Sequence, residues 1–220
     1  MTDTWISEIG QHRFKKYSQC GEEGFIRFIL SNIGYNNKFL VDIGAWDGTH
    51  LSNSKLFVEC GYTALLIDGD NHGNPNVKKE WITRENVCDV LAKYDCPKEF
   101  SLLSYDTDGN DFDILLAILT NYKPDLVVCE INGSFPLGVS KKMVYNPSHV
   151  WNNNDYFGFS YSAALKLAEM TGYKVVFQND SINVYMVRKE LLANPEAEIQ
   201  IPFAQRHGHP HKPDGLWENV

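Results

Sequence analysis

Acidic and amide side chains interrupt or follow several short apolar runs of this sequence, and such a pattern can serve three kinds of chemistry. A carboxylate can accept hydrogen bonds from the hydroxyls of a ligand, take up a proton, or coordinate a hard cation. The residues in question are Asp42, Asp47, Asp68, Asp106, Asp108, Glu130 and Asn132. Because the apolar runs are typical of buried strands, these side chains are expected to gather at one end of a sheet.

The stretch Phe39–Gly48 is the most informative of these segments. Its first half, Phe39–Ile43, is too short for a helix and too apolar for a half-exposed strand, so it predicts a buried central strand. Gly44 and Gly48 then allow a tight turn and a close approach of the backbone to a ligand. A strand, a glycine turn and a helix together form a nucleotide-sized site at the carboxyl end of the strand.

The turn Gly44-Ala-Trp-Asp-Gly48 differs from a pyrophosphate-binding loop. It lacks the third glycine and carries Asp47 where an anionic phosphate would have to sit. An acidic turn suits a cationic or neutral ligand instead. S-adenosylmethionine fits, because its amino group and sulfonium are positive and its adenosine carries no phosphate. The alternative is an ordinary glycine turn that Asp47 caps.

Two further segments are expected to complete a nucleoside site. Asp68 ends the apolar run Thr63–Ile67, about 20 residues beyond the glycine turn, where a carboxylate typically binds the ribose hydroxyls. Asp70 is a second choice for this role, and both could instead be exposed loop acids. Asn86, at the end of a third predicted strand over 81–87, is placed by its position alone near the adenine.

Two neighbouring strands would bring Asp106, Asp108, Glu130 and Asn132 around one crevice. We predict Asp106 and Glu130 as catalytic, because a carboxylate at the ligand crevice can take up a proton from a reacting group. Asp108, Glu130 and Asn132, with Asp106, form an oxygen-rich set that could hold Mg²⁺. In the alternative, Asp106 holds the methionine ammonium, Asp108 and Asp111 cap the next helix, and there is no metal.

The elements that must position these residues follow from hydrophobic periodicity. Helical stripes are predicted over 21–33, 53–60, 112–120 and 160–170, and apolar runs typical of strands over 39–43, 63–67, 81–87, 101–105, 124–129, 173–177 and 182–187. The last two strands are joined by only Gln178-Asn-Asp-Ser181, which demands an antiparallel hairpin. We therefore predict an α/β, Rossmann-like fold with a single seven-stranded, mostly parallel sheet and an antiparallel C-terminal hairpin, the form of this sheet found in methyltransferases.

Length and charge narrow the range of partners. A chain of 220 residues with 43% hydrophobic content fits one domain. The net charge of −8 disfavours nucleic acid and anionic membranes, whose binding requires basic surface. Neither the start of the chain nor any later segment resembles a signal peptide or a membrane span, so a cytoplasmic protein with a small-molecule or carbohydrate substrate is expected.

The domain is expected to have three parts. Residues 1–36 form an N-terminal helical segment that packs on the core, 37–190 form the catalytic domain with a substrate loop or lid at 137–155, and 191–220 form a tail. The tail carries His207, His209 and His211 among glycines and prolines. Alternating histidines can bind metals, but a flexible terminus explains them equally well, and they are left out of the predicted site.

Five motifs, taken together, are similar to those of FkbM-like S-adenosylmethionine-dependent methyltransferases, from about Tyr17 to Arg188. They are Tyr17-Ser-Gln-Cys-Gly-Glu-Glu, Leu40-Val-Asp-Ile-Gly-Ala-Trp-Asp-Gly48, Leu102-Leu-Ser-Tyr-Asp-Thr-Asp-Gly-Asn-Asp111, Glu130-Ile-Asn132 and Tyr156-Phe-Gly-Phe-Ser160. The acidic glycine turn is common to many methyltransferases, whereas the third and fifth motifs are more particular to this group.

The resemblance implies an O-methyltransferase that acts on sugars, polyketides or other small hydroxylated molecules. By position, it implies that Asp68 holds the ribose, that Asp106 faces the methionine end, and that the cofactor is lined by Asp42, Gly44, Ala45, Asp47 and Gly48. The chain departs from the pattern at Asp68-Gly-Asp70, where such proteins often have Glu-x-Pro. Residues 137–155 match little of the family.

Two rival functions use the same fold. A catalytically silent protein could bind S-adenosylmethionine or a nucleotide without turnover. A nicotinamide-dependent oxidoreductase is disfavoured by the incomplete glycine fingerprint and by the terminal hairpin.

Overall fold

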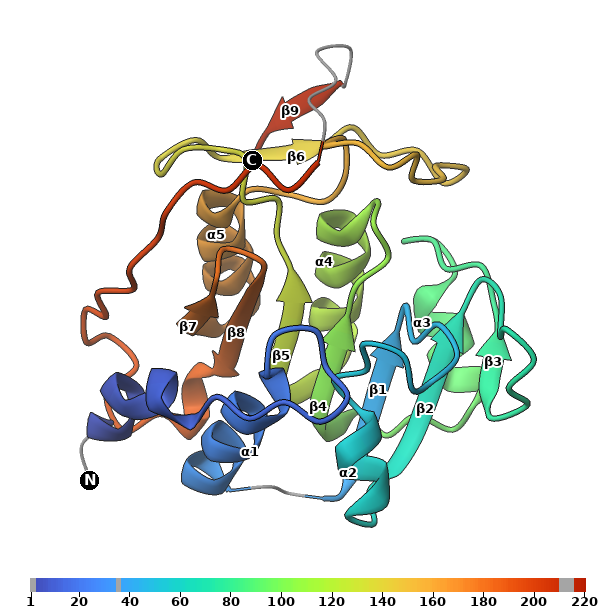
Figure 1. Ribbon diagram of the computed structural model, residues 1–220, viewed down its shortest axis with the longest axis horizontal. Coiled ribbons are helices and arrows are strands. Elements are labelled where there is room, and N and C mark those ends of the chain that lie inside the picture. The colour runs from blue at the N-terminus through green and yellow to red at the C-terminus, as the bar shows by residue number, and fades with distance from the viewer. Residues whose placement is uncertain (1–2, 35–36, 210–215) are drawn as a thin grey trace.

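The computed structural model describes residues 3–34, 37–209 and 216–220. Its centre is a seven-stranded sheet in the order β3-β2-β1-β4-β5-β8-β7 (Figure 1). The strands are β1 (Phe39–Ile43), β2 (Thr63–Asp68), β3 (Val77–Lys79), β4 (Glu99–Tyr105), β5 (Lys123–Glu130), β7 (Tyr173–Asn179) and β8 (Asn183–Arg188). The first five of these are parallel, whereas β8 is antiparallel to both β5 and β7. The predicted α/β fold, with one mostly parallel sheet and an antiparallel hairpin, is confirmed.

Strand β1 lies in the interior of the sheet, between β2 and β4, and its side chains other than Asp42 are apolar. Val41 pairs with Leu65 of β2 on one side and with Leu103 of β4 on the other. Leu40, Val41 and Ile43 are fully buried. A strand that is buried on both faces requires helices on both sides of the sheet.

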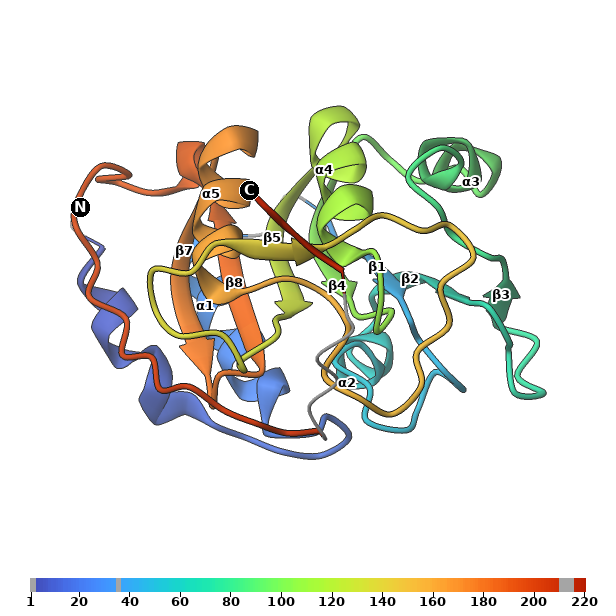
Figure 2. The same ribbon diagram turned by 90° about the horizontal axis from the view of Figure 1, so that it is seen from above.

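The helices form two layers. Helices α3 (Val87–Lys93), α4 (Asp111–Asn121) and α5 (Tyr161–Thr171) cover one face, and the 3₁₀-helix η1 (Thr4–His12), α1 (Glu22–Ile33) and α2 (Lys55–Glu59) lie on the other (Figure 2). Ser160 caps the start of α5 by accepting a hydrogen bond from the amide of Ala163, and Gly172 ends the helix in the left-handed conformation. Both ends of α5 match the prediction. None of the helices among the described residues is long and apolar enough to cross a bilayer.

The third predicted strand, over 81–87, is wrong. The strand at this edge of the sheet is β3, Val77–Lys79, and Val87 begins helix α3. Only Val77 of β3 is buried, so the strand leaves no apolar run in the sequence. Trp81 and Ile82 suggested a strand, but they lie in the turn that connects β3 to α3.

The long connection after β5 and the C-terminal tail contain regular structure that the sequence did not predict. Strand β6 (Lys141–Met143) pairs antiparallel with β9 (Trp217–Asn219), and Lys142 lies opposite Glu218. This small sheet lies above α4 and α5, beyond the end of the main sheet where the parallel strands finish (Figure 1). A short 3₁₀-helix, η2 (Lys189–Leu191), follows β8. Of the tail histidines, His211 lies outside the described residues.

Candidate functional site

The order of the strands creates a crevice between β1 and β4. The chain runs from β1 to β2 and β3 on one side, then returns to β4 on the other side of β1, so the connections at the carboxyl ends diverge. Gly44 and Asp106 follow these two strands and touch each other there. A Cβ atom on Gly44 would lie 1.5 Å from the carbonyl oxygen of Asp106, and Gly44 has a φ of +86°. The first residue of the turn must therefore be glycine.

The turn is anchored on the neighbouring strand. The amides of Gly44 and Ala45 both donate to the carbonyl of Ile67, at 2.9 and 3.0 Å. The carboxylate of Asp47 accepts from the amides of Thr49 and His50, at 2.8 and 2.6 Å, and these hydrogen bonds lower its pKa. Asp47 thus caps the turn, as the alternative interpretation expected. Asp47 is half-buried, and its lowered pKa favours the charged form. A role towards a cationic ligand stays a prediction.

Asp42 lies in β1, before the turn, and its side chain is buried. The side chain is 4% exposed, and the hydroxyl of Ser54 donates to it at 2.5 Å. Burial raises the pKa of Asp42 to about 6, although hydrogen bonds from Ser54 and Ser104 oppose this shift. Its direct partners are these two hydroxyls, so Asp42 ties β1 to the start of α2.

Asp68 joins the end of β2 to the glycine turn. One carboxylate oxygen accepts from the amide of Trp46 at 2.8 Å, and the other from the amide of Asp70 at 3.0 Å. Each oxygen keeps a further lone pair for a ligand. Asp70 instead pairs with Lys79 at 3.1 Å. Of the two acids, Asp68 is the one that lies against the turn.

Asn86 is committed to the backbone of the turn before α3. Its carbonyl oxygen accepts from the amide of Thr83 at 2.8 Å, and its amide group donates to the carbonyl of Trp81 at 2.8 Å. A Cβ atom on Gly69 would lie 3.1 Å from the Trp81 ring. The exposed indole of Trp81 therefore lies next to the end of β2, where sequence reasoning expected Asn86 and the adenine.

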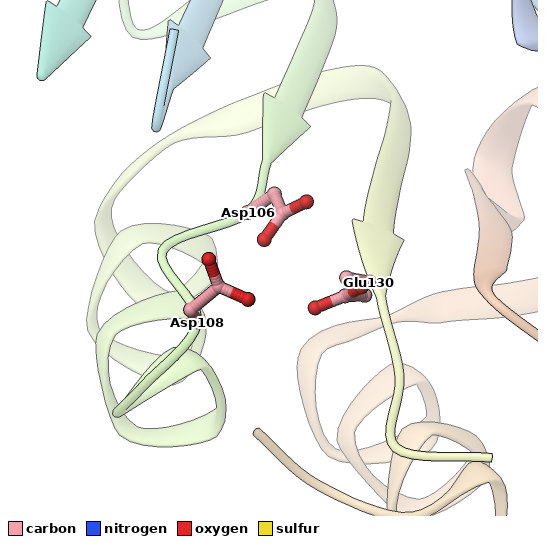
Figure 3. Close-up of side chains that lie close together, drawn as sticks. All are labelled: Asp106, Asp108 and Glu130. Atoms are coloured by element: carbon pink, nitrogen blue, oxygen red, sulfur yellow. The ribbon is translucent and has the colours of Figure 1, made fainter. Parts of the chain in front are cut away.

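Asp106, Asp108 and Glu130 point toward one another from the end of β4, from the loop after it and from the end of β5 (Figure 3). Each offers a carboxylate oxygen within 4.8 Å of those of the others. Glu130 also has a buried oxygen, Oε2, with no hydrogen-bond partner among the described residues. The two strand ends therefore bring together three of the four predicted side chains.

The charges of this acidic cluster, Asp106, Asp108 and Glu130, oppose one another. Removal from water raises the pKa of Glu130 well above its usual range, and the nearby Asp106 and Asp108 raise it further. The pKa of Asp106 is likewise raised, first because the protein around the carboxylate displaces water and then because of the charges of Asp108 and Asp111. Because carboxylates this close repel one another when all of them are charged, the cluster favours the binding of protons or of a cation.

The fourth predicted ligand, Asn132, is used elsewhere. It is 1% exposed, and its amide nitrogen donates to the carbonyls of Asp155 and Phe157, at 2.7 and 3.0 Å. Its oxygen accepts from the amide and the hydroxyl of Ser134, at 3.1 and 2.5 Å. Asn132 thus fixes the chain at 155–157 over the end of β5 and has no free oxygen directed at the cluster.

Sequence reasoning missed three side chains near Glu130. Gln19, Arg206 and His209 line a pocket of about 70 Å³, and Glu130 lines it too. In the sequence, Gln19 stands in the first motif, Tyr17-Ser-Gln-Cys-Gly-Glu-Glu, and His209 stands among the tail histidines that were left out of the predicted site. The hydroxyl of Ser18 accepts a hydrogen bond from the amide of Glu22, the first residue of α1, at 3.0 Å, and Gln19 lines the pocket.

Comparison with known proteins gives a similarity of fold alone. No protein-family model matches the sequence, and no curated protein matches it. The CMeT domain of the citrinin polyketide synthase is similar at 10% sequence identity and a TM-score of 0.44, over 78% of this chain and 54% of that one. This chain therefore spans only about half of that protein's length.

Two further solved structures are similar at the same level. An S-adenosylmethionine-dependent methyltransferase from Archaeoglobus fulgidus has 15% identity and a TM-score of 0.41, over 69% of this chain and 67% of that one. CalS10, an amino pentose methyltransferase from Micromonospora echinaspora solved with S-adenosylmethionine bound, has 10% identity and a TM-score of 0.45, over 84% and 92%. Similarities this low assign no residue of this chain, and the candidate site rests on its own geometry.

Proposed function

We propose that this protein is an S-adenosylmethionine-dependent methyltransferase that methylates a hydroxyl of a sugar or of another small hydroxylated molecule. One observation carries the proposal: an acidic glycine turn, the ribose-type acid Asp68 and the acidic cluster follow adjacent strands at one crevice. The motifs shared with FkbM-like methyltransferases agree with it. The antiparallel β8, inserted between β5 and β7, is the arrangement expected for a methyltransferase sheet.

The cofactor is proposed to lie across the ends of β1 and β2. Asp68 would accept hydrogen bonds from the ribose hydroxyls with the lone pairs that Trp46 and Asp70 leave free. The half-buried carboxylate of Asp47 would oppose a pyrophosphate at this turn by like-charge repulsion, whereas it would favour a ligand with a sulfonium and an ammonium group. Asp106 follows β4, the other neighbour of β1, and would face the methionine end.

The chemistry requires little beyond position and a proton acceptor. Methyl transfer needs the acceptor oxygen in line with the methyl group and the sulfur, and such positioning can contribute about 7 kcal/mol or more to lowering the barrier. The acceptor proton must then be removed. Raised pKa values make Asp106 and Glu130 stronger bases when they are ionised, and the buried Oε2 of Glu130 has no other partner among the described residues.

A divalent cation fits the same cluster. Asp106, Asp108 and Glu130 would hold it through hard carboxylate oxygens, which match the preference of Mg²⁺. A bound cation would supply Lewis acidity toward an acceptor hydroxyl. It would compete with protons for these carboxylates, so its affinity should fall as the pH falls.

Calorimetric titration with S-adenosylhomocysteine tests the proposal without knowledge of the acceptor. We expect saturable binding of one molecule per chain, together with a higher melting temperature at saturation. NAD⁺, titrated in parallel, should leave both readouts unchanged. Binding of NAD⁺ without binding of S-adenosylhomocysteine would reject the function, whereas tight cofactor binding without methyl transfer to any acceptor would favour the catalytically silent alternative.

A further inference from the structure

Four segments that are far apart in the sequence meet beside Glu130. The loop before α1, the segment after β5, the turn of the terminal hairpin and the C-terminal tail line the pocket of about 70 Å³. Among its lining residues are Gln19, Gly133, Asp155, Phe157, Arg206 and His209. Because Glu130 lines the pocket and also belongs to the acidic cluster, the pocket opens on the groups proposed to receive the acceptor proton.

Several hydrogen bonds hold the tail in place, so the tail forms a fixed wall of this pocket. The amide of Arg206 donates to the carbonyl of Gly133 at 2.8 Å, and the hydroxyl of Ser181 donates to the carbonyl of Ala204 at 2.6 Å. Gln205 donates to the carbonyl of Ser134 at 2.5 Å. A Cβ atom on Gly133 would lie 2.5 Å from the carbonyl oxygen of Ser181, so this close contact of the tail, the hairpin turn and the end of β5 requires glycine.

Two polar side chains of the pocket have hydrogen-bonding capacity to spare. The side chain of Gln19 makes no hydrogen bond within the described part of the chain. The backbone around it is fixed by Glu23, whose carboxylate accepts from the amides of Tyr17 and Ser18. Arg206 donates one hydrogen bond, to the carbonyl of Asp180 at 3.3 Å, and forms no ion pair with a carboxylate of the described residues. Both side chains are therefore available donors.

An aromatic wall completes the pocket. The ring of His209 packs edge-on against Trp151 and Phe157, with ring centroids 4.9 and 5.8 Å apart. His209 also affects the pKa of Asp108. Burial raises this pKa, and the charge interaction with His209 lowers it. The imidazole thus contacts both aromatic rings and lines the pocket together with Glu130.

We propose, on the basis of the methyl transfer proposed above, that this pocket is the acceptor subsite and takes the edge of a neutral hydroxylated ring, such as a hexopyranose. The pocket's volume of about 70 Å³ is less than half that of a cavity that holds benzene, about 150 Å³, so it admits hydroxyl groups at one edge of a ring and not a whole ring. Gln19 and Arg206 donate to these hydroxyls, and the carbon face of the ring lies toward His209. A carboxylate on the ring would meet Glu130 and Asp155 as well as the guanidinium of Arg206, so a neutral ring is the ligand that brings no like charges together here.

Saturation-transfer NMR on the full chain, saturated with S-adenosylhomocysteine, tests this subsite. The probes are methyl glucopyranoside, methyl galactopyranoside and methyl rhamnopyranoside, each at about 10 mM, with glucuronate as the anionic probe. We expect saturation transfer to at least one neutral sugar. Transfer to none of the three, or to glucuronate alone, overturns the inference.

Substitutions then locate the binding. Gln19→Ala and Arg206→Ala should each raise the dissociation constant of the sugar at least tenfold, while the dissociation constant of S-adenosylhomocysteine changes less than twofold. The matched control is His207→Ala, in the same exposed tail, where the ring meets the side chain of Gln205 and does not line the pocket. Sugar binding that persists in folded Gln19→Ala and Arg206→Ala proteins overturns the location.

The cofactor readout separates this inference from the proposed function. If S-adenosylhomocysteine binds and no neutral sugar does, the acceptor subsite fails alone. If S-adenosylhomocysteine itself does not bind, the proposed function fails. A parallel loss of cofactor and sugar affinity in Arg206→Ala would make the pocket part of the cofactor site and would also overturn the inference.

Discussion

The carboxylate of Asp68 has two duties at the scale of single residues, since it holds the turn through the Trp46 amide and is proposed to hold the ribose. We expect Asp68→Ala to weaken the binding of S-adenosylhomocysteine by about 1.5–3 kcal/mol, the range for lost hydrogen bonds to a charged group. Calorimetric titration measures the change. Asp70→Ala is the matched control, because Asp70 pairs with Lys79 on the surface, and its affinity should stay within twofold. Unaltered affinity in a folded Asp68→Ala protein contradicts the assignment.

The acidic cluster can be tested for a proton acceptor and for a cation separately. Asp106→Asn keeps the shape of the side chain but removes the charge, so methyl transfer to a sugar acceptor should fall about 10²–10⁴-fold. Incubation with EDTA followed by the same assay tests for the cation. Activity that survives chelation but is lost in Asp106→Asn rejects the metal and keeps the carboxylate. Full activity in both Asp106→Asn and Glu130→Gln contradicts the whole catalytic assignment.

Asp111 gives the site a measurable pH dependence of stability. It is 1% exposed, one carboxylate oxygen has no partner among the described residues, and burial raises its pKa to about 7. The folded state therefore favours the protonated form. Between about pH 4 and 7 it binds more protons than the unfolded state, whose pKa is about 3.9. The free energy of unfolding must then fall as the pH rises through this range.

We expect Asp111→Asn to be more stable than the natural protein at pH 8, by at most about 4 kcal/mol, and equally stable near pH 4. Urea unfolding in the presence of EDTA measures both values. Asp113→Asn, in the same turn of α4, should be less stable than the natural protein at pH 8, because it removes the ion pair to Lys142 at 2.7 Å. If the free energies of unfolding of Asp111→Asn and the natural protein differ by the same amount at pH 4 and at pH 8, the raised pKa of Asp111 is contradicted.

At the scale of the elements, the glycine turn after β1 depends on close contact with β4. Gly44 and Gly61 both have a φ of +86°, but only Gly44 lacks room for a side chain, because Gly61 has nothing within 4 Å. Gly61→Ala should therefore cost only the backbone strain, about 1–2 kcal/mol. Gly44→Ala should cost more and should abolish binding of S-adenosylhomocysteine, since the Asp106 backbone has to move. Equal losses of stability and intact cofactor binding in the two variants contradict this account.

Regular apolar patterns explain which elements the sequence could predict. Strand β1 and helix α5 were predicted because each buries a continuous run or stripe and ends at a glycine. Strand β3 buries only Val77, and β6 and β9 pair three residues each although they stand about a third of the chain apart. Such short edge pairings leave no local period, so tertiary contacts decide them.

The site follows the same rule. Asp68, Asp106 and Glu130 could be predicted because the carboxyl ends of neighbouring parallel strands meet by topology. The commitment of Asn132 to the 155–157 backbone and the position of His209 beside the cluster depend on how two loops fold over the sheet. Neither loop has a hydrophobic period, so nothing local in the sequence specifies these contacts.

At the scale of the whole molecule, the sheet depends on the N-terminal segment to cover one of its faces. Phe25, Ile26 and Ile29 of α1 are fully buried against side chains of β1, β4 and β5. Glu22 ties this helix to the terminal hairpin, because its carboxylate accepts from the side-chain amide groups of Asn179 and Asn183, both at 3.1 Å. The segment is thus tied to the core by apolar contacts and by buried hydrogen bonds.

We therefore expect Ile29→Ala to destabilise the whole molecule by about 2–5 kcal/mol, as for other large-to-small changes in a closed core. Ser31→Ala, on the exposed side of the same helix, should change the free energy of unfolding by less than about 0.5 kcal/mol. Urea unfolding followed by circular dichroism and by tryptophan fluorescence measures both variants. The two probes should give one coincident transition, because α1 completes the layer that buries β1. Loss of α1 in a separate, earlier transition, with the sheet and cofactor binding intact, would contradict the role of this segment as part of the core.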